Sequence, residues 1–220
     1  SSLPSEYGIG TMGAEARKFV DFLEAAGQSY WQMLPICPTS YGDSPYQSFS
    51  TYAGNLYFID LDLLCEQGLL FPEEYKERDW GNDPKQVDYG KIYESRYPVL
   101  RKAAERFAEQ IPESYETFCR NNAYWLDDYA LFMAVKDQFG GVEWTKWAED
   151  IRLRWENAMD YYRRELYFDI EFQQYMQFKF YEQWMKLKKY ANEKGIQIIG
   201  DIPIYVAMDS ADTWAHPELF

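Results

Sequence analysis

The sequence contains very little histidine and cysteine. Of its 220 residues, one is a histidine and three are cysteines. Cys37, Cys65 and Cys119 have no metal-ligand spacing, and such a sparse, odd-numbered set is typical of free thiols in a reducing compartment. We therefore expect no metal site and no catalytic triad that depends on histidine. The single histidine, His216, is expected to be a surface or capping residue.

The sequence also lacks a long hydrophobic run and an excess of positive charge. No stretch is apolar for long enough to span a bilayer, and the first residues do not have the pattern of a signal peptide. With 22 basic and 36 acidic residues the net charge is −14, which repels phosphate backbones and anionic lipid surfaces. We predict a cytoplasmic protein with a neutral ligand, and neither nucleic acid nor a membrane as a partner.

Aromatic residues are abundant, at 19% of the chain within a hydrophobic content of 47%. That content is sufficient for a substantial core, so a globular protein is expected. The rings have two competing uses, because they pack cores and also form flat platforms for ligands such as sugars or bases. Most of them are expected to lie in the core.

Residues 38–55, PTSYGDSPYQSFSTYAGN, combine rings with short hydrogen-bonding groups and have almost no aliphatic content. They follow an apolar run at residues 31–36, which predicts a short buried strand. Because ligands bind at the carboxyl ends of strands in α/β folds, this segment is a candidate binding loop. A tight, self-packed surface loop explains the same composition equally well.

The remaining segments read mainly as helices. The spacing of apolar residues predicts a helix over 14–26 ended by Gly27, followed by a strand at 30–34 and a short extended run at 56–59. Residues 61–168 have helical periodicity and little β-branched content. We expect them to form a helical insertion, with its best helices at 91–110, split or kinked near Pro98, and at 124–139.

A second anchor follows a long amphipathic helix predicted over residues 171–194. Gly195 is placed to end that helix, and the isoleucine-rich run at 196–206 predicts another strand. The order helix, glycine, strand is that of a βα repeat, so Asp201 is well placed at the mouth of a parallel barrel. Asp201 is otherwise interpreted as a turn or capping residue.

These two segments, SYGDSPYQSFSTYAGN at 40–55 and GDIPIYVAMDSADTWAHPELF at 200–220, strongly resemble the amylomaltases, which are bacterial 4-α-glucanotransferases. The opening SSLPSEYGIGTMG matches the same family, whereas the middle region matches only in its helical character. The resemblance implies a cytoplasmic enzyme of the α-amylase superfamily. Such an enzyme cuts an α-1,4-glucan, keeps one piece covalently attached, and transfers it to a sugar 4-hydroxyl.

The resemblance implies an α/β fold, namely part of a (β/α)8 TIM barrel with a large helical insertion. Residues 1–60 would be the first part of the barrel, residues 61–170 the insertion, and residues 171–220 the continuation of the barrel. The family pattern also places Ser44 and Tyr46 along the glucan groove and Tyr41 at an outlying glucan contact. Asp201 would contact sugar near the cleavage point or orient a catalytic arginine, while Asp43 is expected to be structural.

Retaining glycosyl transfer needs two carboxyl groups about 5–5.5 Å apart and no cofactor. In the family these carboxylates lie downstream of the Gly-Asp-x-Pro-Ile segment. The one local mimic, residues 148–151, lies upstream, lacks the family's glycine and reads as a helix. We therefore assign no catalytic residue and expect an N-terminal portion of the enzyme that is inactive alone. A non-catalytic carbohydrate-binding protein is the alternative, and a hydrolase of the same superfamily is a weaker one.

Overall fold

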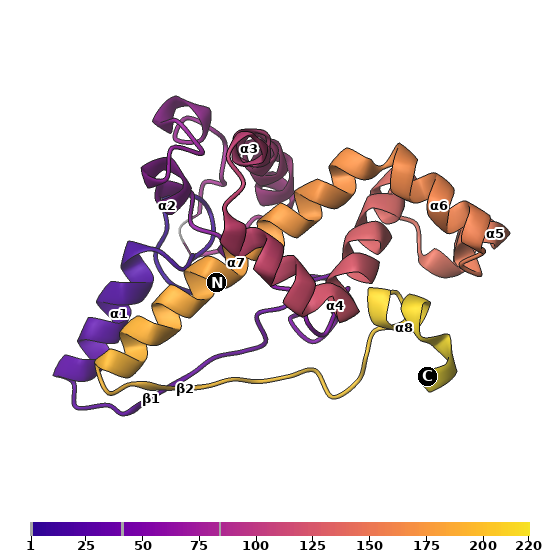
Figure 1. The fold of residues 1–220 in the computed structure, drawn as a ribbon. Helices are drawn as coiled ribbons and strands as arrows, with labels where there is room; N and C mark the ends of the chain where they lie inside the picture. Colours follow the sequence, from indigo (N-terminus) through magenta and orange to yellow (C-terminus); the bar gives the residue numbers. More distant parts are fainter. Residues whose placement is uncertain (1, 41, 84) are drawn as a thin grey trace. The chain divides into compact units, whose positions relative to one another are not determined.

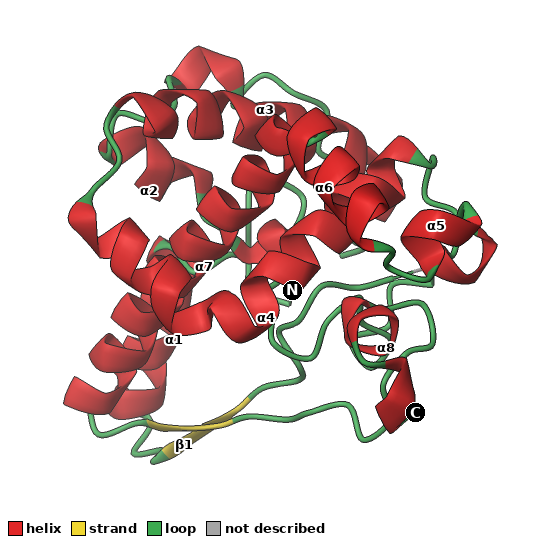
Figure 2. Cartoon of the chain, turned by 45° about the vertical axis from the view of Figure 1, so that its right-hand side comes forward, coloured by secondary structure: helices red, strands yellow, loops and turns green. Residues whose placement is uncertain are grey.

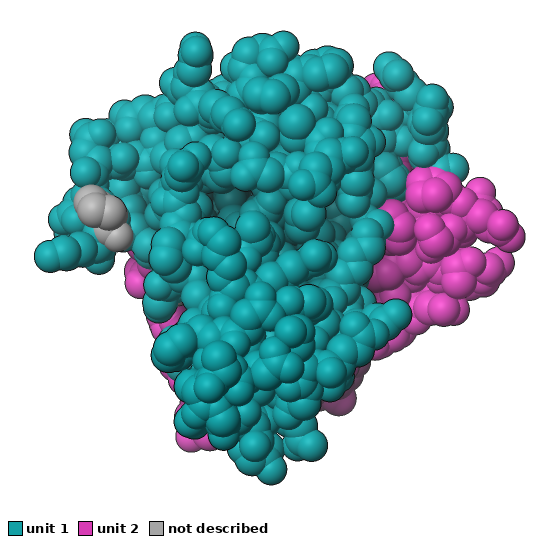
Figure 3. All heavy atoms as spheres, turned by 90° about the vertical axis from the view of Figure 1, so that its left-hand side faces the viewer, with its two compact units in different colours: residues 1–34, 55–111, 179–201 teal, residues 35–54, 112–178, 202–220 magenta. Residues whose placement is uncertain are grey.

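The computed structural model describes residues 2–40, 42–83 and 85–220, which divide into two compact units. Unit 1 comprises residues 1–34, 55–111 and 179–201, and unit 2 comprises residues 35–54, 112–178 and 202–220 (Figure 3). Each unit is therefore built from three separate stretches of the chain. The predicted division at residues 60 and 170 stays a prediction.

Helices account for most of the regular structure (Figure 2). Unit 1 contains α1 (Ala14–Ala25), α2 (Leu61–Glu66) and α3 (Tyr89–Glu109), unit 2 contains α4 (Glu113–Gln138), α5 (Glu149–Arg152), α6 (Glu156–Glu165) and α8 (Ala211–Ala215), and α7 (Tyr167–Glu193) has residues in both. Short 3-10 turns occupy Leu56–Phe58, Pro72–Glu74, Trp144–Lys146 and Pro217–Leu219. The described residues between 61 and 168 form no strand, which confirms the predicted helical character of this region.

The ends of α1 and α7 confirm the roles predicted for Gly27 and Gly195, and Gly140 follows α4 in the same way. Gly27, Gly140 and Gly195 have φ angles of 68°, 66° and 75°, in the left-handed region that glycine adopts without a steric cost. The chain reverses there, and the amide of Gln28 donates to the carbonyl of Leu23 at 2.9 Å. Pro98 lies inside α3, which is one helix and is not split.

The strands β1 (Tyr30–Gln32) and β2 (Gln197–Ile199) pair in parallel, with Tyr30 opposite Gln197 (Figure 1). The first strand is shorter than predicted, and its predicted burial is wrong, because Tyr30 and Leu34 are 59% and 60% exposed. The ring of Phe19 in α1 covers Trp31, with centroids 5.1 Å apart. Since only two strands pair among the described residues, this sheet has open edges and only part of β1 is covered.

The predicted extended run at residues 56–59 is also wrong, because the chain makes a 3-10 turn there. Asn55 caps the turn by accepting a hydrogen bond from the amide of Tyr57 at 2.9 Å, and Asp60 then caps α2 by accepting from Leu63 at 2.9 Å. These two side chains supply the local hydrogen bonds that favour a cap over a strand. Leu56 and Ile59 are buried all the same.

Unit 1 is held together by the second half of α7, which lies beside α1 (Figure 1). The hydroxyl of Tyr190 donates to Asp21 at 2.6 Å. On the buried face of α7, Gln183 accepts from the backbone amide of Asp60 at 2.7 Å and donates to the carbonyl of the same residue at 3.1 Å. The buried side chain of Gln183 thus provides hydrogen-bond partners for the backbone N–H and C=O groups of Asp60, which are not paired in a sheet.

Candidate functional site

The candidate binding loop lies in unit 2 and folds into an irregular hairpin. Thr39 and Ser48 form an antiparallel bridge, and the amide of Ser40 donates to the carbonyl of Gln47 at 3.0 Å. Gly42 and Asp43 have φ angles of 88° and 56°, so both occupy left-handed turn positions at the tip. The loop is therefore a defined hairpin turn.

Ser44 and Tyr46 stand side by side on this hairpin. The hydroxyl oxygen of Ser44 accepts a hydrogen bond from the amide of Tyr46 at 3.3 Å, which fixes the backbone from which the tyrosine ring projects. The ring is 45% exposed. Tyr41 lies outside the described residues. The structure thus presents Tyr46 at the surface, two residues after the serine that holds its backbone.

The second half of the loop packs against itself. Ser48 and Ser50 are buried, and the hydroxyl of Ser48 donates to the carbonyl of Ser50 at 2.6 Å. The hydroxyl of Ser50 accepts from the amides of Tyr52 and Ala53 at 3.1 and 3.2 Å. These serines are internal braces of the loop. The self-packed interpretation therefore holds for this half, and residues 44 and 46 remain the candidates for ligand contact.

The C-terminal motif supports the loop through α8. The carboxylate of Asp212 accepts from the backbone amide and from the hydroxyl of Thr51, both at 3.0 Å. The amide of Ala211 donates to the carbonyl of Phe49 at 2.8 Å. The two motifs singled out in the sequence thus meet within unit 2. Sequence reasoning selected Asp201 from the second motif and missed Asp212, although Ser210 and the residues after it have the pattern of a helix start.

A buried lysine on α4 is a second support that the sequence did not reveal. The Nζ atom of Lys136 donates to Asp209 at 2.6 Å and to the carbonyl of Val142 at 3.3 Å, and it lies 5.0 Å from the centroid of Phe49. Asp209 also accepts from the amide of Trp144 at 3.3 Å. The lysine side chain is only 6% exposed, so its charge depends on these partners.

Gln177 on α7 is the third support. It accepts from the amide of Gly54 at 2.7 Å and donates to the carbonyl of Gly54 at 2.9 Å. Gln177 is fully buried in unit 2, and Gln183 is almost fully buried in unit 1. A glutamine on the apolar face of a helix is a sequence signal for such a role, because a buried side-chain amide needs hydrogen-bond partners.

The thiol nearest to the loop in sequence belongs to Cys37. Cys37 is buried, with its Sγ atom 3.9 Å from the carbonyl oxygen of Pro45. Burial raises the pKa of the Cys37 thiol, and burial likewise raises the pKa of Cys119. Since the thiolate is the reactive form, a raised pKa disfavours both thiols as nucleophiles. The cysteines are free, as predicted.

Asp201 belongs to unit 1, where it is exposed and follows β2 by two residues. Ser44 and Tyr46 belong to unit 2, and the expectation that Tyr46 and Asp201 share one cleft stays a prediction. The strand predicted over residues 196–206 is too long, since β2 ends at Ile199. Ile204 and Tyr205 beyond it are 87% and 86% exposed, so these two side chains are not packed as those of a buried barrel strand would be.

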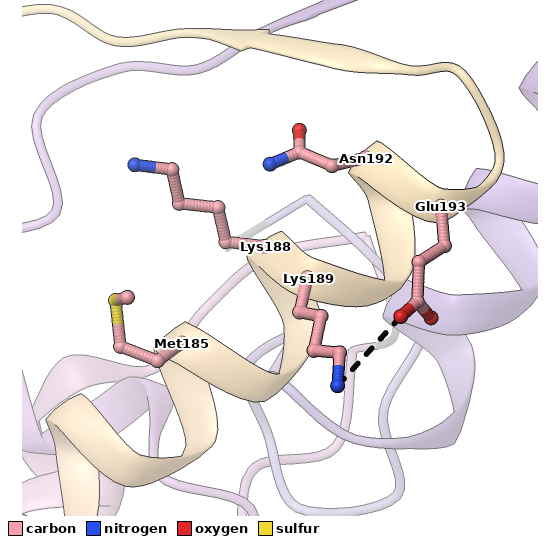
Figure 4. Close-up of a pocket in the computed structure, with 5 residues that line it drawn as sticks. All are labelled: Met185, Lys188, Lys189, Asn192 and Glu193. Atoms are coloured by element: carbon pink, nitrogen blue, oxygen red, sulfur yellow. Dashed lines mark ion pairs between the residues drawn. The ribbon is translucent and has the colours of Figure 1, made fainter.

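Two other features bear on the chemistry. Residues 148–151 lie at the start of α5, as the helical interpretation of this carboxylate pair predicted. A shallow hollow of about 370 Å³ lies along α7 and is lined by Met185, Lys188, Lys189, Asn192 and Glu193 (Figure 4). All of these side chains come from one helix, and Lys189 pairs with Glu193 at 3.7 Å. The hollow contains none of the predicted site residues.

Within the described part of the chain, no group of three or more histidine, cysteine or acidic side chains could hold a metal ion. None of the described helices is both long and apolar enough to cross a membrane.

The fold is that of the amylomaltase class of proteins. The chain matches an amylomaltase from Streptococcus agalactiae, solved in complex with acarbose, with a TM-score of 0.96 and 46% identity over 99% of this chain and 44% of that chain. An amylomaltase from Corynebacterium glutamicum shares the fold at 19% identity, with a TM-score of 0.70 over 98% of this chain and 31% of that chain.

The family profile for 4-alpha-glucanotransferase matches residues 1–220, and the chain belongs to this family. It is 50% identical to the 4-alpha-glucanotransferase of Clostridium butyricum and 47% identical to that of Thermus thermophilus. Each match covers 100% of this chain, but only 45% and 44% of these relatives. The chain thus spans less than half the length of the curated relatives it matches. The resemblance drawn from the sequence motifs is confirmed.

Proposed function

We propose that residues 1–220 are the N-terminal portion of a 4-α-glucanotransferase, which moves an α-1,4-glucan segment to a sugar 4-hydroxyl by a retaining double displacement. The observation that carries this proposal is the family match over the whole chain, at about half identity to curated 4-alpha-glucanotransferases. The structural likeness to an amylomaltase solved with acarbose supports glucans as the ligand class. The negative charge of the chain also suits a neutral glucan.

We propose further that the chain is part of a (β/α)8 barrel carrying a helical insertion. Support comes from two helix-to-strand steps, α1 to β1 and α7 to β2, each with a left-handed glycine just after the helix. The two strands that follow them are parallel neighbours, as barrel strands are. The exposed hydrophobic side chains of the sheet, Tyr30 on β1 and Ile199 on β2, suit a sheet that continues in the remainder of the enzyme.

Within this portion, Tyr46 and Ser44 are proposed to line the glucan groove. The half-exposed ring of Tyr46 can stack on a pyranose face, and its position is fixed by the hydrogen bond that its own amide makes to Ser44. Tyr41 is proposed as an outlying glucan contact. Asp201, at the carboxyl end of β2, is proposed to contact sugar near the cleavage point or to orient a catalytic arginine.

These residues bind and orient the glucan, and the chain is assigned neither the nucleophile nor the acid/base. In the proposed reaction those two roles need a pair of carboxyl groups, which the remainder of the enzyme would supply. Nothing in the reaction requires a cofactor. A cytoplasmic location remains our inference from the sparse cysteines.

The test is product analysis on maltotriose with the intact protein that contains this chain. Transfer yields glucose together with maltodextrins longer than the substrate, whereas hydrolysis yields only shorter products. Unchanged maltotriose, despite measurable binding of maltodextrin, would instead identify the alternative function, a non-catalytic carbohydrate-binding protein. Products that are only shorter would identify a hydrolase.

A further inference from the structure

One helix of unit 2 ends on an arginine in the position that glycine takes after α1, α4 and α7. Arg154 follows α5 with a φ angle of 57°, in the left-handed region that other residues adopt only at a steric cost. Its amide donates to the carbonyl of Ile151 at 3.1 Å, and the amide of Trp155 donates to that of Asp150 at 2.9 Å. These two bonds are the pattern of a Schellman turn, in which glycine is the usual left-handed residue. Contacts of the arginine side chain must therefore offset the steric cost.

The guanidinium of Arg154 joins α4 to α8. Its Nη2 atom donates to the carboxylate of Asp128 on α4 at 2.6 Å, and its Cζ atom lies 4.3 Å from the centroid of the Trp214 ring on α8. Trp214 is buried, and its indole N–H donates to the carbonyl of Ile151 at 3.2 Å. A planar guanidinium can lie over an aromatic ring while it pairs with a carboxylate, which an ammonium group does less well.

The position of α8 depends on contacts of this kind. With five residues, Ala211–Ala215, it is too short to be stable as a helix by itself. Asp212 on this helix accepts one hydrogen bond from the amide and one from the hydroxyl of Thr51. The binding loop is therefore held by α8, and α8 is held in part by the contact between Trp214 and Arg154.

We propose that Arg154 is a positioning residue for glucan binding, which acts through α8 and Asp212 on the loop that carries Tyr46. This inference rests on the proposed function, in which Tyr46 lines the glucan groove. Arg154 itself needs no contact with the sugar. The path from Arg154 to the loop consists of contacts within unit 2.

The experiment replaces Arg154 in the intact enzyme. Arg154→Gly keeps the left-handed turn at no steric cost and removes the guanidinium, so this variant should fold. Arg154→Lys is the milder change, because it retains a cation for Asp128. Arg106→Ala is the matched control. Arg106 lies in unit 1 and makes the same two kinds of contact, donating to Glu74 at 2.7 Å and lying 4.5 Å from the centroid of Phe71.

Two properties are measured for each protein: kcat and KM for maltotriose, and the rate at which chymotrypsin cuts within residues 38–55. We expect Arg154→Gly to raise KM about fivefold, the size expected for the loss of one cation–π contact, with kcat within about twofold of wild type. Its loop should also be cut faster, because α8 no longer holds Thr51 firmly. Arg154→Lys should change both properties less, and Arg106→Ala should leave both unchanged. If Arg154→Gly does not fold, Arg154→Lys carries the same comparison.

The double variant Arg154→Gly with Asp212→Ala tests the path between the two residues. If Arg154 acts through α8, its loss adds little once Asp212 no longer holds the loop, so the double variant should have the KM of Asp212→Ala within about twofold. A further fivefold rise in the double variant would overturn the proposal. A wild-type KM and cleavage rate in Arg154→Gly would overturn it too, as would an equal change in Arg106→Ala. An intact enzyme that leaves maltotriose unchanged would refute the proposed transferase, and the cleavage rates would then decide the role of Arg154.

Discussion

Replacing Asp212 with alanine is expected to loosen the loop that carries Tyr46. The Asp212 carboxylate accepts two hydrogen bonds from Thr51, one from its backbone amide and one from its hydroxyl, each 3.0 Å long. Each such bond contributes about 0.5–1.5 kcal/mol net. Because Asp212 is half-buried and water can partly replace it, we take about 2 kcal/mol for the pair.

If the loop must then be ordered when glucan binds, this free energy appears as weaker binding. About 1.4 kcal/mol corresponds to a tenfold change, so the KM for maltotriose should rise by up to about 30-fold, with kcat changed much less. Asp212 is thus a positioning residue, because it acts through the loop. Initial rates of the intact enzyme give both constants.

Two milder variants test the reasoning. Asp212→Asn keeps one acceptor for the amide of Thr51, and Thr51→Val removes only the hydroxyl. Each variant should therefore show about half of the free-energy change expected for Asp212→Ala. Chymotrypsin, which cuts after exposed aromatic residues, should cleave the Asp212→Ala loop faster than the wild-type loop. A KM within twofold of wild type, with an unchanged rate of cleavage, would refute the support role of Asp212.

Three further changes have expected outcomes. Tyr46→Ala in the intact enzyme should weaken glucan affinity by about 1–3 kcal/mol through lost stacking and hydrogen bonding, and an unchanged KM would count against its place in the groove. Lys136→Met should lower the free energy of unfolding of the intact enzyme in urea by about 2–3 kcal/mol, because Asp209 loses its ion pair and retains the hydrogen bond from the amide of Trp144. Combining Lys136→Met with Asp209→Asn should recover part of that loss, because the unpaired charge is then removed. Glu74 accepts two hydrogen bonds from Arg106, at 2.7 and 2.8 Å, and they lower the pKa of Glu74 from 4.5 to about 2. Glu74→Gln should therefore lower the free energy of unfolding most at neutral pH. The difference from the wild type should shrink as the pH falls from 4.5 towards 2. A difference that does not depend on pH would show that the ion pair is not its source.

Local signals predicted much of this structure. Glycine after an amphipathic run located the ends of α1 and α7, since a left-handed residue is a local requirement. The parallel order of β1 and β2 followed from the helix-glycine-strand pattern. The motif at residues 40–55 pointed to the loop that presents Tyr46, because rings and short polar groups without aliphatic residues do not build a core.

Features set by distant contacts were not predictable in the same way. Asp212 and Thr51 are far apart in the chain, and nothing local indicates that a capping-type aspartate supports a loop. Lys136 looks like an ordinary surface lysine in the sequence, because its partner Asp209 follows much later. The extended run expected at residues 56–59 was wrong because polar caps outweighed apolar content at Asn55. Burial of β1 was overestimated, because sequence alone does not say how many strands cover it.

The most direct test of the central claim compares the purified 220-residue chain with the intact enzyme on maltotriose, following glucose release. We predict turnover by the intact enzyme and none by the chain alone, because we propose that the chain contributes binding residues and that the rest of the enzyme contributes the two catalytic carboxyl groups. Turnover by the chain within tenfold of the intact enzyme would contradict this account, and it would direct attention to Glu149, Asp150, Asp169 and Glu171.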